Sequence, residues 1–288
     1  MAQAPRIFDR DLLCVRRRRA QRLGTTAFLM DRVADDLAER LSFVRRQFGR
    51  ALDLGTPTDA VARALAASGK VASVISARDI AFDEEALPFG DGSLDMVVSG
   101  LSLQFVNDLP GTLIQVRRAL KPDGLFLAAL VGGESLQELR EAFAQAESDI
   151  EGGVSPRVVP FADMRDIGAL LQRAGFALPV VDSDKVVVRY RDVFGLMHDL
   201  RRMGATNVLL ERRRSPLMRA TLLRMAEIYG ERFSDPDRRL RATFEIVWLS
   251  GWAPHESQQK PLKPGSATRR LADALGAKEI SAGEKTGR

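Results

Sequence analysis

The chain has 288 residues, of which 45% are hydrophobic and 28% are charged, a composition typical of a globular protein and not of a mainly disordered one. No apolar run approaches the roughly 20 residues of a membrane-spanning helix. Asp9 interrupts the start of the chain, so we expect no secretory signal peptide. One cysteine, Cys14, and two histidines, His198 and His255, exclude an internal disulfide and disfavour a cysteine- or histidine-rich metal site.

The formal net charge is +5, and lysine accounts for only seven of the 43 basic residues. An excess of arginine can indicate phosphate or nucleic-acid recognition. The abundant alanine favours a simpler explanation, which is a GC-rich genome that encodes arginine in place of lysine. The run at 16–19 is a single basic cluster without the interleaved aromatic residues of a base-stacking surface. A nucleic-acid-binding module therefore ranks last among the functions considered.

The first half of the chain alternates helical and extended patterns. Apolar residues at three- and four-residue spacing predict a helix over 25–48, and a short apolar run predicts a strand ending at Gly55. Thr56 is a suitable N-cap and Pro57 a suitable first residue for the next helix. Further predicted elements follow in chain order: a strand at 70–76, a strand at 94–99, a helix at 109–120, a turn at 121–124 and a strand at 125–131. This alternation, with continuously apolar strands, predicts a parallel sheet covered on both faces.

The second half has more helix. Helices are predicted at 135–147, 161–174, 192–203 and 216–229, and strands at 177–182, 186–190 and 243–252. Trp248 and Trp252 share one face of the last strand, which indicates core packing. His198, on a predicted helix, is expected to be a partly buried structural residue.

Sequence motifs point to a known fold. The segment at 85–130, with "LKPDGLF" before its last strand, resembles the second half of a class I S-adenosylmethionine-dependent methyltransferase domain of type 11. The segments at 132–147, 152–176, 197–209 and 251–267 resemble one branch of these proteins. That branch is the family of the mitochondrial complex I assembly factor described as a protein-arginine hydroxylase, with its bacterial relatives. The malonyl-carrier-protein methyltransferase of biotin synthesis is a more distant relative.

This resemblance, which covers about residues 7–267, implies a cofactor site for S-adenosylmethionine. Its expected residues, in a vestigial or weak form, are Asp53, Gly55, Asp83, Glu84 and Ser99. In the family, the loop reads Asp-x-Gly-x-Gly-x-Gly, and its last two glycines fall where this chain has Pro57 and Asp59. Proline removes a backbone donor, and Asp59 places a carboxylate near the expected methionine carboxylate. The loop therefore looks more like a helix start than like a working cofactor loop.

The chain is also shorter than the family pattern. In the family, an acidic residue that ends the second strand binds the ribose, and a helix and a third strand follow. Here only six residues separate Ser76 from Asp83, whereas a parallel crossover needs at least about a dozen. One strand–helix unit is therefore missing or collapsed, and Asp79 is the nearest candidate for the ribose-binding acid.

Two further groups are candidates for contact with a substrate or partner. Glu134 and Ser135 begin a predicted helix just past the carboxyl end of a strand, where α/β sheets place ligands; ordinary helix capping is the alternative. His255, Glu256 and Ser257 follow the last strand and could line the mouth of the cleft. No catalytic residue is identified, and no metal is expected.

We therefore predict an α/β, methyltransferase-like (Rossmann-like) fold with a shortened N-terminal half and a helical cap insert. The predicted parts are an N-terminal helical segment (1–49), the core (50–133), the cap (134–235), a returning strand (236–253) and a largely flexible tail (254–288). The favoured function is a complex I assembly protein that binds a protein partner, such as a complex I subunit, on a degraded cofactor fold. An active S-adenosylmethionine-dependent methyltransferase or a protein-arginine hydroxylase is the alternative. The expected location is the cytoplasm, with a peripheral position at the inner membrane also considered.

Overall fold

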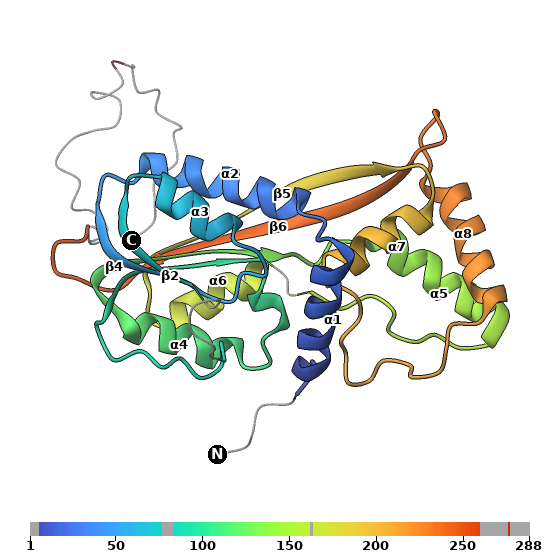
Figure 1. Ribbon diagram of the computed structural model, residues 1–288, viewed down its shortest axis with the longest axis horizontal. Coiled ribbons are helices and arrows are strands. Elements are labelled where there is room, and N and C mark those ends of the chain that lie inside the picture. Colours follow the sequence, from blue (N-terminus) through green and yellow to red (C-terminus); the bar gives the residue numbers. More distant parts are fainter. Residues whose placement is uncertain (1–5, 77–82, 162–163, 260–275, 277–288) are drawn as a thin grey trace, which may run out of the picture. The chain divides into compact units, whose positions relative to one another are not determined.

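The central element is a six-stranded mixed sheet, with the strand order β2-β1-β3-β4-β6-β5 (Figure 1). The computed structural model describes residues 6–76, 83–161, 164–259 and 276. Strands β2, β1, β3 and β4 run parallel, whereas β6 is antiparallel to both β4 and β5. The strands are β1 (Phe48–Asp53), β2 (Val71–Ser76), β3 (Leu94–Gly100), β4 (Leu120–Val131), β5 (Ala177–Tyr190) and β6 (Leu240–Trp252). The predicted α/β class is confirmed.

Helices cover both faces of the sheet (Figure 1). They are α1 (Arg10–Leu23), α2 (Phe28–Phe43), α3 (Ala60–Ala67), α4 (Leu109–Ala119), α5 (Gln137–Glu151), α6 (Met164–Arg173), α7 (Val193–Arg202) and α8 (Arg219–Phe233). Successive residues of β3 point to opposite faces. Met96 and Val98 therefore join one apolar cluster with α2 and α3, whereas Val97 joins a second cluster with α4 and α6.

The two antiparallel strands extend beyond the rest of the sheet. Pairing between β4 and β6 ends at Val131 and Ile246, while β5 and β6 stay paired as far as Tyr190 and Leu240. The resulting two-stranded ribbon carries α5, α7 and α8 (Figure 1). The Tyr229 hydroxyl on α8 donates to the carbonyl of Arg241 at 2.8 Å, so the helices are hydrogen-bonded to the ribbon as well as packed on it.

The strand prediction for 177–190 was wrong in one respect, because β5 is continuous. The polar residues at 182–185 suggested a break, yet they pair with β6 throughout. Their charged side chains reach neighbouring elements: Asp182 pairs with Arg40 at 2.5 Å, and Lys185 pairs with Glu134 at 2.5 Å. A run of polar residues is compatible with an edge strand when its side chains form ion pairs or are exposed to solvent.

The start of α3 also differs from the prediction. The helix begins at Ala60, and its N-cap position is Asp59, without a side-chain capping bond. Thr56 is therefore not the N-cap, and Pro57 is not the first helical residue. The polar group of Thr56 serves a different purpose, described below. Helix α1, which contains the arginine run at 16–19, falls within the predicted N-terminal helical segment (1–49), but its bounds were not predicted.

The shortening of the N-terminal half is visible in the topology. On the side of β1, the sheet of the described residues ends at β2, as expected if one strand–helix unit is missing. Asp79, the candidate for the ribose-binding acid, belongs to residues 77–82, which are outside the described part of the chain. The range 134–235 contains the sheet strand β5 as well as helices, and its assignment as a functional cap stays a prediction.

The chain divides into two compact units, Met1–Pro254 and His255–Arg288. All three apolar clusters lie in the first unit. The prediction of a flexible tail falls largely on residues 260–275 and 277–288, outside the described part. Among the described helices, none is both long enough and apolar enough to cross a membrane.

Candidate functional site

The carboxyl ends of β1 and β3 lie side by side, where a parallel sheet of this kind places ligands. Asp53, at the end of β1, is 2% exposed. The Thr56 hydroxyl donates to the Asp53 carboxylate and accepts from the backbone N–H of Gly100 at 2.9 Å. The Ser99 hydroxyl donates to the carbonyl of Leu54 at 2.7 Å. These bonds hold the loop after β1 against the end of β3, so Asp53 and Ser99 both have protein partners.

Gly55 is the residue of this loop for which glycine is required. Its φ is +72°, and a Cβ atom there would lie 2.3 Å from Glu84 Oε1 and 2.6 Å from Ser102 Oγ. The Ser102 hydroxyl donates to that same Glu84 oxygen at 3.1 Å. The fold thus brings together Gly55 and Glu84, which the sequence analysis had grouped, and the Glu84 side chain occupies the space beside the glycine.

Helix α1 supplies the positive charge at this edge. Arg10 forms ion pairs with Glu84, with Asp83 at 3.1 Å and with Glu85 at 3.1 Å. Burial alone would lower the pKa of Arg10, but the carboxylates of Glu84 and Asp83 raise it overall. The predicted residues Asp83 and Glu84, together with Glu85, therefore form a three-carboxylate group that already binds a guanidinium of the same chain.

A second arginine of α1 reaches the same place. Arg17 donates to the Ser102 hydroxyl at 3.2 Å. Burial lowers the pKa of Arg17, although the nearby Glu84 carboxylate acts in the opposite direction. The arginines at 16–19 point in different directions, because successive residues are about 100° apart around an α-helix. Neighbouring arginines of the run therefore contact different parts of the protein.

The cavity next to these residues is small. Its volume is about 80 Å³, and Arg17, Pro57, Thr58 and Leu101 contribute to its lining. Pockets that hold ligands of drug or cofactor size span roughly 300–1,000 Å³. The cavity is therefore much smaller than a pocket that would enclose a nucleoside joined to an amino acid.

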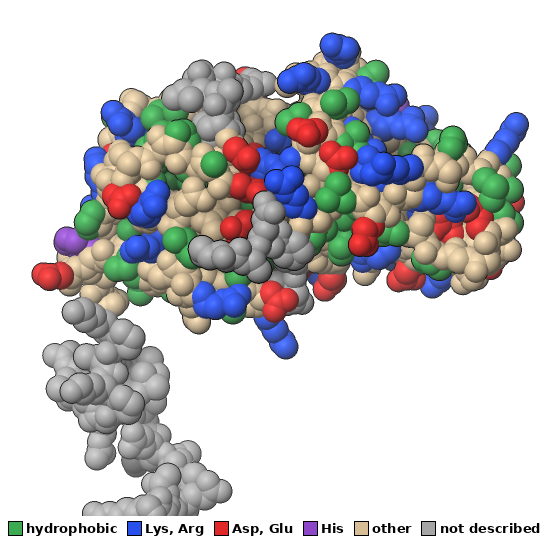
Figure 2. Space-filling view, turned by 90° about the horizontal axis from the view of Figure 1, so that it is seen from below, with side chains coloured by type: hydrophobic (Ala, Val, Ile, Leu, Met, Phe, Trp, Pro, Cys, Tyr) green, Lys and Arg blue, Asp and Glu red, His purple; other side chains and the backbone are tan. Residues whose placement is uncertain are grey.

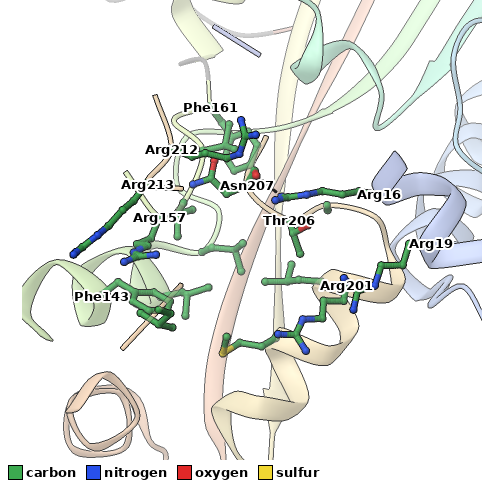
Figure 3. Close-up of a pocket in the computed structure, with 18 residues that line it drawn as sticks. Arg16, Arg19, Phe143, Arg157, Phe161, Arg201, Thr206, Asn207, Arg212 and Arg213 are labelled. Carbon is green, nitrogen blue, oxygen red and sulfur yellow. Dashed lines mark hydrogen bonds between the residues drawn. The ribbon is translucent and has the colours of Figure 1, made fainter. Parts of the chain in front are cut away.

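A larger cavity of about 350 Å³ adjoins this one and shares Leu136, Phe161 and Leu200 with it (Figure 3). Apolar side chains of α5, α7 and the segment at 158–161 contribute to its lining. Six arginines also line it: Arg16, Arg19, Arg157, Arg201, Arg212 and Arg213. This site was not predicted from the sequence, because its residues are scattered from α1 to the loop before α8 and share no motif.

The remaining predicted residues lie elsewhere. Ser135 is fully buried, and its hydroxyl accepts from the backbone N–H of Glu245 on β6 at 2.9 Å. Glu134 forms the surface ion pair with Lys185. Their role in partner contact stays a prediction.

The residues after the last strand belong to the second unit. His255 Nδ1 lies 2.7 Å from Ser257 Oγ, and both residues, like Glu256, are exposed. Their contact with a substrate or partner also stays a prediction. His198 is exposed on α7, so the expectation of a partly buried histidine was wrong; its helix turns it to solvent. Within the described ranges, no three His, Cys, Asp or Glu side chains are grouped to hold a metal ion.

Comparison with known proteins identifies close relatives. A family model described as a methyltransferase domain matches residues 27–179. The arginine-hydroxylase NDUFAF5, mitochondrial, of Danio rerio is 39% identical over 85% of this chain and 81% of its own length. The human protein of that name is 39% identical, over 91% and 81% of the two chains. A malonyl-[acyl-carrier protein] O-methyltransferase of Gallionella capsiferriformans is 35% identical, over 82% and 88%.

Solved structures agree on the fold. A putative methyltransferase from Bacillus halodurans superposes with a TM-score of 0.50 and 14% identity, over 76% of this chain and 98% of that one. At this identity, the comparison supports the methyltransferase fold and nothing narrower.

Proposed function

Because the chain belongs to the methyltransferase-domain family and, within it, to the group of the arginine-hydroxylase NDUFAF5, we propose that it binds a protein partner on a methyltransferase fold whose cofactor site is weakened. The observation that carries this proposal is the position of helix α1. Its Arg10 and Arg17 occupy the carboxyl edge of β1 and β3 and bind the polar groups that a cofactor would need.

The loop after β1 supports the same conclusion. Pro57 has no backbone N–H to offer, and the Thr56 hydroxyl is engaged with Asp53 and Gly100. The space beside Gly55 is taken by Glu84 and Ser102. The described residues therefore fit S-adenosylmethionine poorly, and we derive no reaction step that passes through it.

The partner that we propose is a subunit or assembly intermediate of respiratory complex I, on the strength of the family resemblance. The location that goes with it is the cytoplasm, at or near the inner membrane. The family-like sequence is retained in the cap helices and in the segment at 251–267, while the cofactor loop departs from the pattern. A protein-binding role would require the sequence of the cap helices and of this segment, but it would not require a functioning cofactor loop.

An active enzyme is the second candidate, since Asp53, Gly55 and the acidic residues at 83–85 are retained at the expected edge. Either methyl transfer or the arginine hydroxylation named for the NDUFAF5 relatives would fall under this candidate. Tight cofactor binding would favour it over the proposal above.

Calorimetric titration of the full chain with S-adenosylmethionine tests the proposal. Each hydrogen bond lost to a charged or polar ligand group is worth about 1.5–3 kcal/mol, so the loss of the loop donor at Pro57 and of the ribose-binding acid implies roughly a hundred- to ten-thousandfold weaker binding. An active malonyl-[acyl-carrier protein] O-methyltransferase is the positive control. Micromolar or tighter binding by this chain would overturn the proposal.

Affinity capture from the native cells tests the partner. We expect a complex I subunit or assembly intermediate to be enriched by the full chain at moderate salt. Recovery of nucleic acid alone, lost steeply as salt rises, would favour a nucleic-acid-binding module instead.

A further inference from the structure

The 350 Å³ cavity combines an apolar lining with arginines on opposite walls (Figure 3). Arg16 and Arg19 come from α1 and Arg201 from α7, while Arg157, Arg212 and Arg213 come from segments on the other side. Apolar side chains that include Leu139, Phe143 and Leu217 also line the cavity. Among the described residues, no Asp or Glu lines the cavity.

The arginines differ in how far their charges are balanced. On one wall, Arg157 pairs with Glu147 at 2.6 Å, and Arg212 pairs with Asp9 at 3.2 Å. On the other wall, Arg19 and Arg201 are exposed, and their side chains make no hydrogen bond or ion pair within the described part of the chain. The unbalanced positive charge is therefore concentrated on the α1–α7 wall.

Arg16 gives independent support. Its guanidinium donates to the carbonyl of Asn207 and has no carboxylate partner among the described ion pairs. Burial lowers its pKa, and the positive charges of Arg212 and Arg19 lower it further, against the weaker opposing effect of Asp9. A bound anion would relieve this repulsion.

We propose that this cavity binds an acidic peptide segment of the partner, with an apolar side chain in the cavity and carboxylates against Arg19 and Arg201. This inference rests on the proposed function, because it specifies the chemistry of the protein partner. The apolar lining accounts for the anchor residue, and the exposed guanidinium groups suit carboxylates placed on either side of it.

The distribution of charge favours a peptide over a nucleic acid. A phosphate backbone needs a track of cations and gains little from an apolar cavity. Here the arginines surround an apolar centre, and Figure 2 shows basic side chains gathered on the half of this face that holds α1, α5 and α7, with apolar side chains exposed between them. An apolar anchor flanked by carboxylates matches both features.

The probe is a short fluorescein-labelled peptide, Glu-Glu-Leu-Leu-Glu-Glu with neutral ends, measured by fluorescence anisotropy with the full chain near physiological salt. We expect saturable binding. Replacing the glutamates with glutamines, or the leucines with alanines, should each weaken it about tenfold, as two partly exposed ion pairs or one buried side chain would. Equal binding of the glutamine peptide would overturn the proposal.

The matching protein variant is Arg19→Gln with Arg201→Gln, which removes the two unpaired cations. It should bind the glutamate peptide about tenfold more weakly. The control, Arg18→Gln with Arg22→Gln, makes the same charge change at exposed positions of α1 outside the cavity, and should change affinity less than about twofold. An equal loss in both variants would show that only net charge matters and would overturn the proposal.

Reversing the charge of both arginines tests the site through a gain of binding, which a misfolded variant would not show. Arg19→Glu with Arg201→Glu should bind the corresponding lysine-flanked peptide more tightly than the unchanged protein does. The absence of tighter binding by this variant would contradict the peptide site. Complete displacement of the glutamate peptide from the unchanged protein by a short single-stranded oligonucleotide at equal concentration would also contradict it. The peptide experiments contain no S-adenosylmethionine, so their result does not depend on the cofactor titration. A failure of the peptide site can therefore be distinguished from a failure of the proposed function.

Discussion

Single residues decide how polar groups are kept inside this protein, and Glu147 is the clearest case. Its side chain is fully buried and accepts from the Ser155 N–H at 2.6 Å, the Ser155 hydroxyl at 2.7 Å and Arg157 Nε at 2.6 Å. Burial alone would raise the pKa of Glu147, but the bonds from Ser155 and Arg157 lower it below the ordinary value. The same residue fixes Arg157 on the wall of the large cavity.

Glu147→Gln should therefore destabilise the fold in a pH-dependent way. A lowered pKa in the folded state means that the carboxylate stabilises the fold above its unfolded pKa of about 4.3, and that this contribution is lost as the pH falls through the folded value. Removing one partner of a buried ion pair costs about 3 kcal/mol. Urea unfolding should show this deficit at pH 7 and a smaller one below about pH 4.

The exposed Glu231→Gln on α8 is the control and should be neutral at both pH values. A deficit for Glu147→Gln that stays constant with pH would show that the carboxylate is not held ionised by these bonds.

The loop residues Pro57 and Asp59 lead to a second prediction at this scale. Replacing both with glycine restores a donor and removes a carboxylate, yet we expect binding of S-adenosylmethionine to remain weak. Arg10 and Arg17 still occupy the edge, and the ribose-binding acid has no clear equivalent. The change should also reduce stability by roughly 0.4–1 kcal/mol per site, since glycine raises the entropy of the unfolded chain. Low-micromolar affinity in calorimetry would show that the loop alone was at fault.

At the scale of elements, helix α1 connects the edge of the sheet with the large cavity. Its successive arginines serve different surroundings: Arg10 binds the acidic residues at 83–85, Arg17 reaches Ser102, and Arg16 lines the cavity. Asp9 caps the helix by accepting from the N–H of Leu12. One helix thus contributes side chains both to the edge where the cofactor site is expected and to the proposed peptide site.

Arg10→Ala should destabilise the protein because it leaves the Glu84 carboxylate, only 10% exposed in its side chain, without its cation. We expect a loss of about 1–3 kcal/mol, visible as a lower Tm in thermal unfolding. Arg18→Ala, an exposed position on the same helix, should leave the Tm almost unchanged. Equal effects of the two substitutions would mean that the ion pairs of Arg10 contribute nothing specific.

At the scale of the molecule, the first unit carries the whole described core. Its three apolar clusters lie on the two faces of the sheet and under α1. The β5–β6 ribbon joins the sheet to α5, α7 and α8, so the core and the helices of the large cavity form one body within this unit.

A chain that ends at Pro254 should therefore fold like the full chain. Its free energy of unfolding in urea should change by less than about 0.5 kcal/mol, the range typical of changes outside the core. A much lower stability would show that residues 255–288 contribute to the fold of the first unit. The truncated chain also allows the peptide titration to be repeated without His255, Glu256 and Ser257.

The sequence by itself determined the fold class, the number of early strands and the family. Apolar periodicity places buried strands at 94–99 and 125–131 reliably, because those strands are buried on both faces and depend on little else. The spacing between Ser76 and Asp83 was enough to predict that a strand–helix unit is missing or collapsed. Gly55 and Glu84 could be grouped because both belong to motifs of the resemblance.

Only the tertiary structure decided how those groups are used. The continuity of β5 depends on the partners of its polar residues across the sheet, and Thr56 leaves the N-cap position because Asp53 and Gly100 lie within its reach. The two arginine sites join residues far apart in the chain, such as Arg10 with Glu84 and Arg19 with Arg201. Local periodicity carries no information on such contacts, because they exist only when the helices and loops have packed around the sheet.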